Sequence, residues 1–294
     1  MSESAAFTLR QRAEKLSARL PPLLVEAQRV ASTVAQGVHG RRRVGQGETF
    51  WQFRPYDMGD QPQSIDWRQT AKRDRVFVRE MEWEAAQSTW LWRDTSASMS
   101  WRSSKKFPDK RGRADLLTLA LADLLIRGGE HVALLETGDR PASSRAVLSR
   151  LAHQIELAGT SDNSLPPIRP LPRHGQVVFI GDFLDPLPEI EQVVRGYASA
   201  GVKGHILQIL DPAEEALPYQ GRVRFEGLEG ETPWLLAKVE KVRPDYVARL
   251  TRQRDGLRNL TRSLGWGYDF HRCDQPAQNA LLALFSALSH SVTG

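Results

Sequence analysis

A run of oxygen-bearing side chains, Asp94-Thr95-Ser96-Ala97-Ser98, offers the most specific chemistry in this sequence. One carboxylate and two hydroxyls stand at positions i, i+2 and i+4, where a single tight turn can gather them. Mg²⁺ and Mn²⁺ prefer such oxygen ligands, take about six of them, and commonly keep water at some positions. Asp94, Ser96 and Ser98 therefore predict a divalent-cation site whose open positions an Asp or Glu of a partner protein can fill. The plainer alternative is that these side chains only tie the turn, without a metal.

Two further residues are candidates for the same site. Asp182 follows the apolar run Val177–Ile180 in Gly181-Asp182-Phe183, and we expect it to join the site directly or through a water molecule. Thr160, in Gly159-Thr160-Ser161-Asp162, is the nearest candidate for a further hydroxyl. Asp182 can instead cap a helix, and Thr160 can instead be an ordinary turn residue.

The elements that must position these residues alternate between strand and helix from Ser88 onward. Short apolar runs indicate buried strands, and longer segments with helical periodicity indicate helices. The predicted strands are Ser88–Arg93, His131–Thr137, Val177–Ile180, Gly204–Leu210 and Trp266–His271, with a hairpin within 221–239. The predicted helices are Ala114–Arg127, which reads as strongly amphipathic, Ser143–Ala158, Glu189–Ala200, Tyr246–Leu264 and Gln278–His290. This alternation predicts an α/β fold with a doubly wound, mostly parallel sheet, whose ligands bind at the carboxyl ends of the strands where the strand order reverses.

Three parts are expected along the chain. Residues 1–40 read as an N-terminal helical segment, with a break at Pro21-Pro22 and a second helix from Leu23. Residues 41–85 read as a small β-rich attachment with a strand at 76–78, and residues 86–294 as the α/β domain.

The charged and aromatic block at 54–67 lies within this attachment and has two open interpretations. The first is an ion-pair network that locks the attachment in place, with Tyr56, Ile65 and Trp67 as packing residues, and we favour it. The second is a docking surface for a partner.

The composition indicates a globular protein, since 40% of the 294 residues are hydrophobic and 26% are charged. A single cysteine excludes an intramolecular disulfide, which is typical of a reducing compartment. We find no secretory signal and no apolar run long enough to cross a bilayer. We therefore expect a cytoplasmic protein without a membrane span.

Two other classes of function have weaker support. Nucleic-acid binding rests on two basic loops, Arg41, Arg42 and Arg43, and then Lys105, Lys106, Lys110, Arg111 and Arg113. The second loop can equally form a positive rim that attracts an acidic partner. A metal-dependent hydrolase, either a phosphatase or a nuclease, is the alternative to a binding protein. However, Ser96 stands where a phosphatase of the Asp-x-Asp type needs its second carboxylate, and Ser98 lacks a Gly-x-Ser-x-Gly elbow. We therefore expect a protein that is not an enzyme.

Four ordered motifs make the chain similar to a known family over about residues 40–210. They are Arg54-Pro55-Tyr56-Asp57-Met58-Gly59-Asp60, Ile65-Asp66-Trp67-Arg68-Gln69-Thr70-Ala71, Val78-Arg79-Glu80 and Asp94-Thr95-Ser96-Ala97-Ser98-Met99. Together they resemble the DUF58 family. The resemblance implies a von Willebrand factor A-like fold, a metal-ion-dependent adhesion-like site, and an adaptor that works with a MoxR-type AAA+ ATPase. The chain departs from the family at Gly181, where the pattern has Ser, and in lacking the transmembrane helices that many relatives carry before this region.

Overall fold

The computed structural model describes residues 20–38, 50–56, 65–72, 75–81, 87–228 and 232–290. The chain divides into two compact units. One consists of residues 39–87, and the other combines residues 1–38 with residues 88–294. The helix at residues 20–38 thus belongs to the same unit as the large sheet.

The larger unit is built on a sheet of five parallel strands in the order β4-β3-β5-β6-β9. These strands are β3 (Ser88–Arg93), β4 (His131–Leu134), β5 (Gln176–Gly181), β6 (Lys203–Leu210) and β9 (Gly267–Arg272). From β3 the chain moves outward to β4 and then returns past β3 to β5. The strand order therefore reverses between β3 and β5, whose carboxyl ends lie side by side. The predicted doubly wound parallel α/β fold is confirmed.

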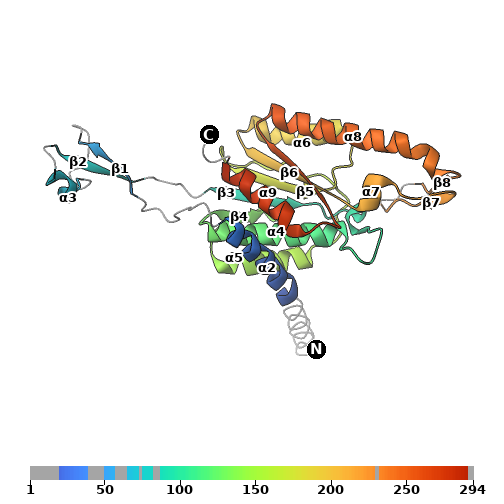
Figure 1. The fold of residues 1–294 in the computed structure, drawn as a ribbon, viewed down its shortest axis with the longest axis horizontal. Helices are drawn as coiled ribbons and strands as arrows, with labels where there is room; N and C mark the ends of the chain where they lie inside the picture. The colour runs from blue at the N-terminus through green and yellow to red at the C-terminus, as the bar shows by residue number, and fades with distance from the viewer. Residues whose placement is uncertain are drawn as a thin grey trace, which may run out of the picture. The chain divides into compact units, whose positions relative to one another are not determined.

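Helices cover both faces of this sheet (Figure 1). One face carries α2 (Leu20–Val38), α4 (Lys110–Arg127), α5 (Arg145–Leu157) and α9 (Ala277–His290), and the other carries α6 (Leu187–Ser199) and α8 (Val239–Ser263). Alternate strand residues point to opposite faces, so Leu91 and Val178 pack into the first layer while Trp90 and Phe179 pack into the second. The sheet is buried on both sides, which explains its continuous apolar runs.

Helix α4 differs from its sequence-based prediction in two ways. It begins at Lys110 rather than Ala114, because Asp109 caps it by accepting a hydrogen bond from the Gly112 N–H at 2.7 Å. It is also not amphipathic, since it lies between the sheet and α2, α5 and α9 and is buried on all sides. Lys110 and Arg113 are buried with it, so the expectation that they form part of a positive surface rim is wrong.

Three short elements complete the larger unit. The 3₁₀ helix η2 (Ala97–Ser100) follows the Asp94 loop. Helix α7 (Pro212–Ala216) follows β6 and was not predicted; Asp211 and Glu214 form a capping box at its start. Strands β7 (Val223–Phe225) and β8 (Trp234–Leu236) pair antiparallel, which confirms the hairpin expected within 221–239.

The smaller unit contains the antiparallel strands β1 (Phe50–Pro55) and β2 (Phe77–Met81) and the short helix α3 (Trp67–Thr70). Strand β2 confirms the strand expected at 76–78. Trp67 is 69% exposed, so its side chain packs little against the described part of its own unit. Asp57 and Asp60, which the predicted ion-pair network includes, lie outside the described residues, as does the helix expected before residue 20.

Candidate functional site

Asp94 lies at the point where the strand order reverses. It follows β3 directly, and its backbone N–H donates to the Ile180 carbonyl of β5 at 2.8 Å. Its carboxylate is buried, and Oδ1 accepts a hydrogen bond from the Ser96 N–H at 2.8 Å, which closes a side-chain turn. Its other oxygen, Oδ2, is buried and has no hydrogen-bond partner among the described residues.

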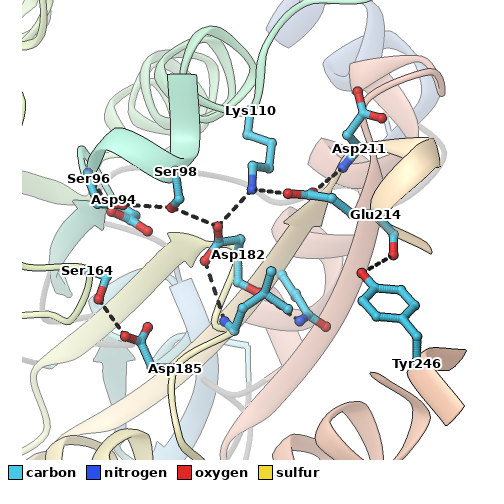
Figure 2. Close-up of polar contacts among 12 residues, drawn as sticks. Asp94, Ser96, Ser98, Lys110, Ser164, Asp182, Asp185, Asp211, Glu214 and Tyr246 are labelled. Carbon is cyan, nitrogen blue, oxygen red and sulfur yellow. Dashed lines mark hydrogen bonds and ion pairs between the residues drawn. The ribbon is translucent and has the colours of Figure 1, made fainter. Parts of the chain in front are cut away.

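The two serine hydroxyls of the loop link Asp94 to the neighbouring strand end (Figure 2). The Ser96 and Ser98 hydroxyl oxygens are 3.0 Å apart, and the Ser98 hydroxyl donates to Asp182 Oδ2 at 3.0 Å. The structure thus brings together four of the five residues singled out from the sequence: Asp94, Ser96, Ser98 and Asp182. They form one connected polar cluster at the carboxyl ends of β3 and β5.

Thr160, the fifth residue, lies beside this cluster but does not join it. Its neighbour Ser161 forms a parallel bridge with Ser96 and donates its backbone N–H to the Thr95 carbonyl at 3.0 Å. The Thr160 side chain itself is exposed. Its hydroxyl makes no hydrogen bond with the part of the chain that the structure describes, so the Thr160 loop contacts the Asp94 loop through its backbone only.

Asp182 is held by a constrained loop after β5. The alternative that it caps a helix is wrong, because α6 begins at Leu187 with Pro186 at the capping position. Its own carbonyl accepts a hydrogen bond from Gln208 at 2.8 Å. The next residue, Phe183, has a φ of 49°, an unusual value for a large side chain. Burial of its ring in the second core layer holds this conformation and so fixes the direction of Asp182.

Lys110 is the residue of this site that sequence reasoning missed. Its ammonium is buried and lies 2.8 Å from Asp182 Oδ2 and 2.5 Å from Glu214 Oε1. Burial alone would lower the pKa of Lys110, but the charges of Asp182 and Glu214 outweigh it and raise the pKa above its usual value. Lys110 is therefore charged. The sequence alone indicates surface charge at this position, because the partners of Lys110 lie 72 and 104 residues away.

The surroundings of Asp94 oppose its charged form, whereas those of Lys110 favour the charged form. Burial, together with the nearby charge of Asp182, raises its pKa to about 7, even though the hydrogen bonds from Ser96 act in the other direction. A carboxylate in this state lacks a compensating positive charge. Such a group is suited to binding a cation or to accepting a proton.

Gly181 allows Asp94 to approach β5 this closely. A Cβ atom at position 181 would lie 2.9 Å from Asp94 Cβ, which is too close for two carbon atoms without a shift. The departure from the family pattern at this position therefore removes a hydroxyl and at the same time leaves room for the buried carboxylate of Asp94.

Only the Asp94 side of the cluster, with Ser96 and Ser98, suits a small cation that prefers oxygen ligands. Among the described residues, no group of three or more His, Cys, Asp or Glu side chains is placed to hold a metal ion. A cation here relies on the free Asp94 oxygen and on the hydroxyls of Ser96 and Ser98. In the other half, the Lys110 ammonium already binds Asp182, and Asp185 in the following loop accepts a hydrogen bond from Ser164 at 2.6 Å.

None of the described helices combines the length and the apolar character that a membrane-spanning helix needs.

Two solved structures are similar to the chain in outline. One is BatB, a conserved hypothetical protein from Bacteroides thetaiotaomicron, with a TM-score of 0.40 and 16% identity over 71% of this chain and 100% of that chain. The other is an aerotolerance-related membrane protein from Bacteroides fragilis, with a TM-score of 0.39 and 16% identity over 70% and 100% of the respective chains. These scores are too low to support an argument about function.

Relatives by sequence are more informative about family than about activity. The uncharacterized proteins Mb1516 of Mycobacterium bovis and Rv1480 of Mycobacterium tuberculosis are each 25% identical to the chain over 268 residues, which is 85% of this chain and 83% of the relative. The model of the family described as "Protein of unknown function DUF58" matches residues 52–256. That match covers well over half of the sequence and both units, and the chain therefore belongs to the DUF58 family.

Proposed function

We propose that this protein is a non-enzymatic adaptor that binds a partner protein through a divalent cation, Mg²⁺ or Mn²⁺, held at Asp94. The observation that carries the proposal is the buried Asp94 Oδ2, which has no hydrogen-bond partner among the described residues and lies beside two hydroxyls. Asp94, Ser96 and Ser98 are the residues that would hold the ion. The ion would supply positive charge shared with a carboxylate of the partner, as in a von Willebrand factor A-like adhesion site.

The same geometry argues against Ser98 as a nucleophile. Its hydroxyl donates to Asp182 Oδ2, the oxygen that also accepts from the charged Lys110 ammonium at 2.8 Å. A carboxylate oxygen engaged in this way is a poor proton acceptor, so Ser98 lacks the adjacent base that a serine nucleophile needs.

The metal-dependent hydrolase alternative has one observation in its favour. A carboxyl with a pKa near 7, like that of Asp94, is suited to general base catalysis at neutral pH. An assay with generic phosphomonoesters and phosphodiesters tests this alternative, and robust turnover abolished by Asp94→Asn would establish it over the binding role.

The partner we propose is a MoxR-type AAA+ ATPase, and a cytoplasmic location for both proteins is part of the proposal. This identification rests on membership of the DUF58 family and not on a feature of the site. The site contributes only the chemistry of the contact, which requires an exposed Asp or Glu on the partner.

A pull-down of the purified ATPase by the full chain, in Mg²⁺ and in chelator, tests the adaptor role. The wild type is expected to retain the ATPase in Mg²⁺ and to lose it in chelator, and Asp94→Asn is expected to lose it in both. Asp162→Asn is the matched control, because Asp162 is an exposed carboxylate in the loop next to the site. Equal recovery in every condition would remove the cation from the mechanism.

A further inference from the structure

The ammonium of Lys110 occupies the centre of the acidic end of the sheet (Figure 2). It bridges two carboxylates from different elements, Asp182 after β5 and Glu214 in α7, at 2.8 and 2.5 Å. Lys110 stands in the first turn of the buried helix α4, and its side chain is only 1% exposed. Its position is therefore fixed by packing as well as by charge.

Of the carboxylates of Asp94, Asp182 and Glu214, only that of Asp94 has an oxygen without a hydrogen-bond partner among the described residues. Glu214 binds Lys110 through Oε1 and accepts the Asp211 N–H through Oε2 at 2.9 Å. Asp182 Oδ2 accepts from both Lys110 and Ser98, and Oδ1 accepts the Leu184 N–H at 3.4 Å. Asp94 Oδ2 remains without a partner among the described residues.

We propose that Lys110 is the resident cation of this site and sets its metal requirement, by neutralising Asp182 and Glu214 and so restricting a divalent ion to Asp94. Divalent ions bind more tightly as more carboxylates are available to them. With a single free carboxylate, the site holds the ion weakly until a partner contributes its own. This inference rests on the proposed function in one respect, namely that Asp94 is the residue that binds the ion.

Removal of the ammonium is therefore expected to strengthen metal binding, the reverse of the usual effect of a mutation in a binding site. Lys110→Met keeps most of the length and apolar stem of the side chain but leaves Asp182 and Glu214 without their cation. Asp182, which the Ser98 hydroxyl links to the Asp94 loop, then becomes available as a second carboxylate for a divalent ion beside Asp94.

The test is a titration of the full chain with Mn²⁺ alone, followed by calorimetry and by the Mn²⁺-induced shift in melting temperature. Lys110→Met is expected to bind Mn²⁺ at least tenfold more tightly than the wild type and to show the larger shift. Lys106→Met, which removes an exposed lysine four residues earlier, is the control and is expected to match the wild type. Lys110→Gln, which keeps a hydrogen-bond donor without charge, gives a second measurement if Lys110→Met folds poorly.

The outcomes separate this inference from the proposed function. If the wild type binds Mn²⁺ through Asp94 and neither Lys110 variant binds it more tightly, the role of Lys110 is disproved while the adaptor role stands. If the wild type alone does not bind Mn²⁺ and both Lys110 variants do, Lys110 is the resident cation, and the pull-down of the ATPase in Mg²⁺ and in chelator decides separately whether the metal-dependent contact exists.

Discussion

Two consecutive residues at the end of β3, Arg93 and Asp94, are ionisable with opposite charges and are both 1% exposed. Their side chains differ in how far their polar atoms are hydrogen-bonded. Arg93 donates to Asp115, to Glu136 at 2.7 Å and to the Ile155 carbonyl at 3.1 Å. Asp94 retains a carboxylate oxygen with no partner among the described residues. A buried charge that is fully compensated holds the structure together, whereas an uncompensated one leaves free energy available for a ligand.

The largest expected effect on stability comes from removing Arg93, the buried charge whose partners compensate it. Arg93→Met leaves Asp115 and Glu136 without their cation, and burial already raises the pKa of both carboxyls. We expect a loss of about 3–5 kcal/mol in the free energy of unfolding, measured by urea denaturation. Arg195→Met, which breaks an exposed pair with Glu191, is the control, with a loss of at most about 1 kcal/mol. Losses of equal size would show that the Arg93 cluster does not stabilise the fold.

Replacement of Asp94, the buried carboxyl with an unpartnered oxygen, is expected to raise the free energy of unfolding by an amount that depends on pH. Since the pKa of Asp94 is raised from 3.8 to about 7, the folded protein keeps a proton between these values that the unfolded chain has released. Stability therefore falls as the pH rises through this window, and Asp94→Asn, which stays neutral, avoids the cost. In chelator the variant is expected to be more stable than the wild type at pH 8, by at most about 4 kcal/mol, and equal to it near pH 4. Thermal denaturation across this range measures the difference, and a less stable variant at pH 8 would mean that Asp94 is compensated after all.

The smallest expected effect concerns the space that Asp94 occupies. Gly181→Ser places a Cβ 2.9 Å from Asp94 Cβ, and overpacking of this kind costs about 1–3 kcal/mol. Gly159→Ser is the matched control, since a Cβ at that position meets no atom within 4 Å. Urea denaturation of both variants measures the cost. Equal stability of the two would mean that Asp94 can shift freely, unlike the fixed guanidinium of Arg93.

Most of the fold could be predicted because the strands are short, apolar and buried on both faces. Leu91 and Phe179 stand in runs whose length and composition leave few alternatives to a central strand. The position of Asp94 directly after such a run predicts a functional site at the carboxyl end of that strand. Helix α7 was missed because its five residues are too few for a periodic pattern, although Asp211 and Glu214 have the spacing of a capping box.

The electrostatic part of the site could not be predicted from the sequence. Lys110 stands in a basic segment that resembles a solvated surface, and only the tertiary fold brings it to Asp182 and Glu214. The cap at Asp109 was a local signal that the helix begins at Lys110, but it does not reveal that this turn is buried. The charge balance of the site, and with it the role of each carboxylate, depends on contacts that span more than seventy residues.

Helix α2 packs against α4, α5 and α9, and Ala27, Val30, Ala31 and Val34 are buried in the core that these helices share. During translation these four apolar side chains emerge well before α9, whose first residue is Ala277. At a synthesis rate of about 5–20 residues per second, the stripe on α2 waits for roughly 10–50 s before its final cover is made. The nascent chain must therefore depend on its own partial core, or on a chaperone of the ribosome exit, to keep that stripe from aggregating.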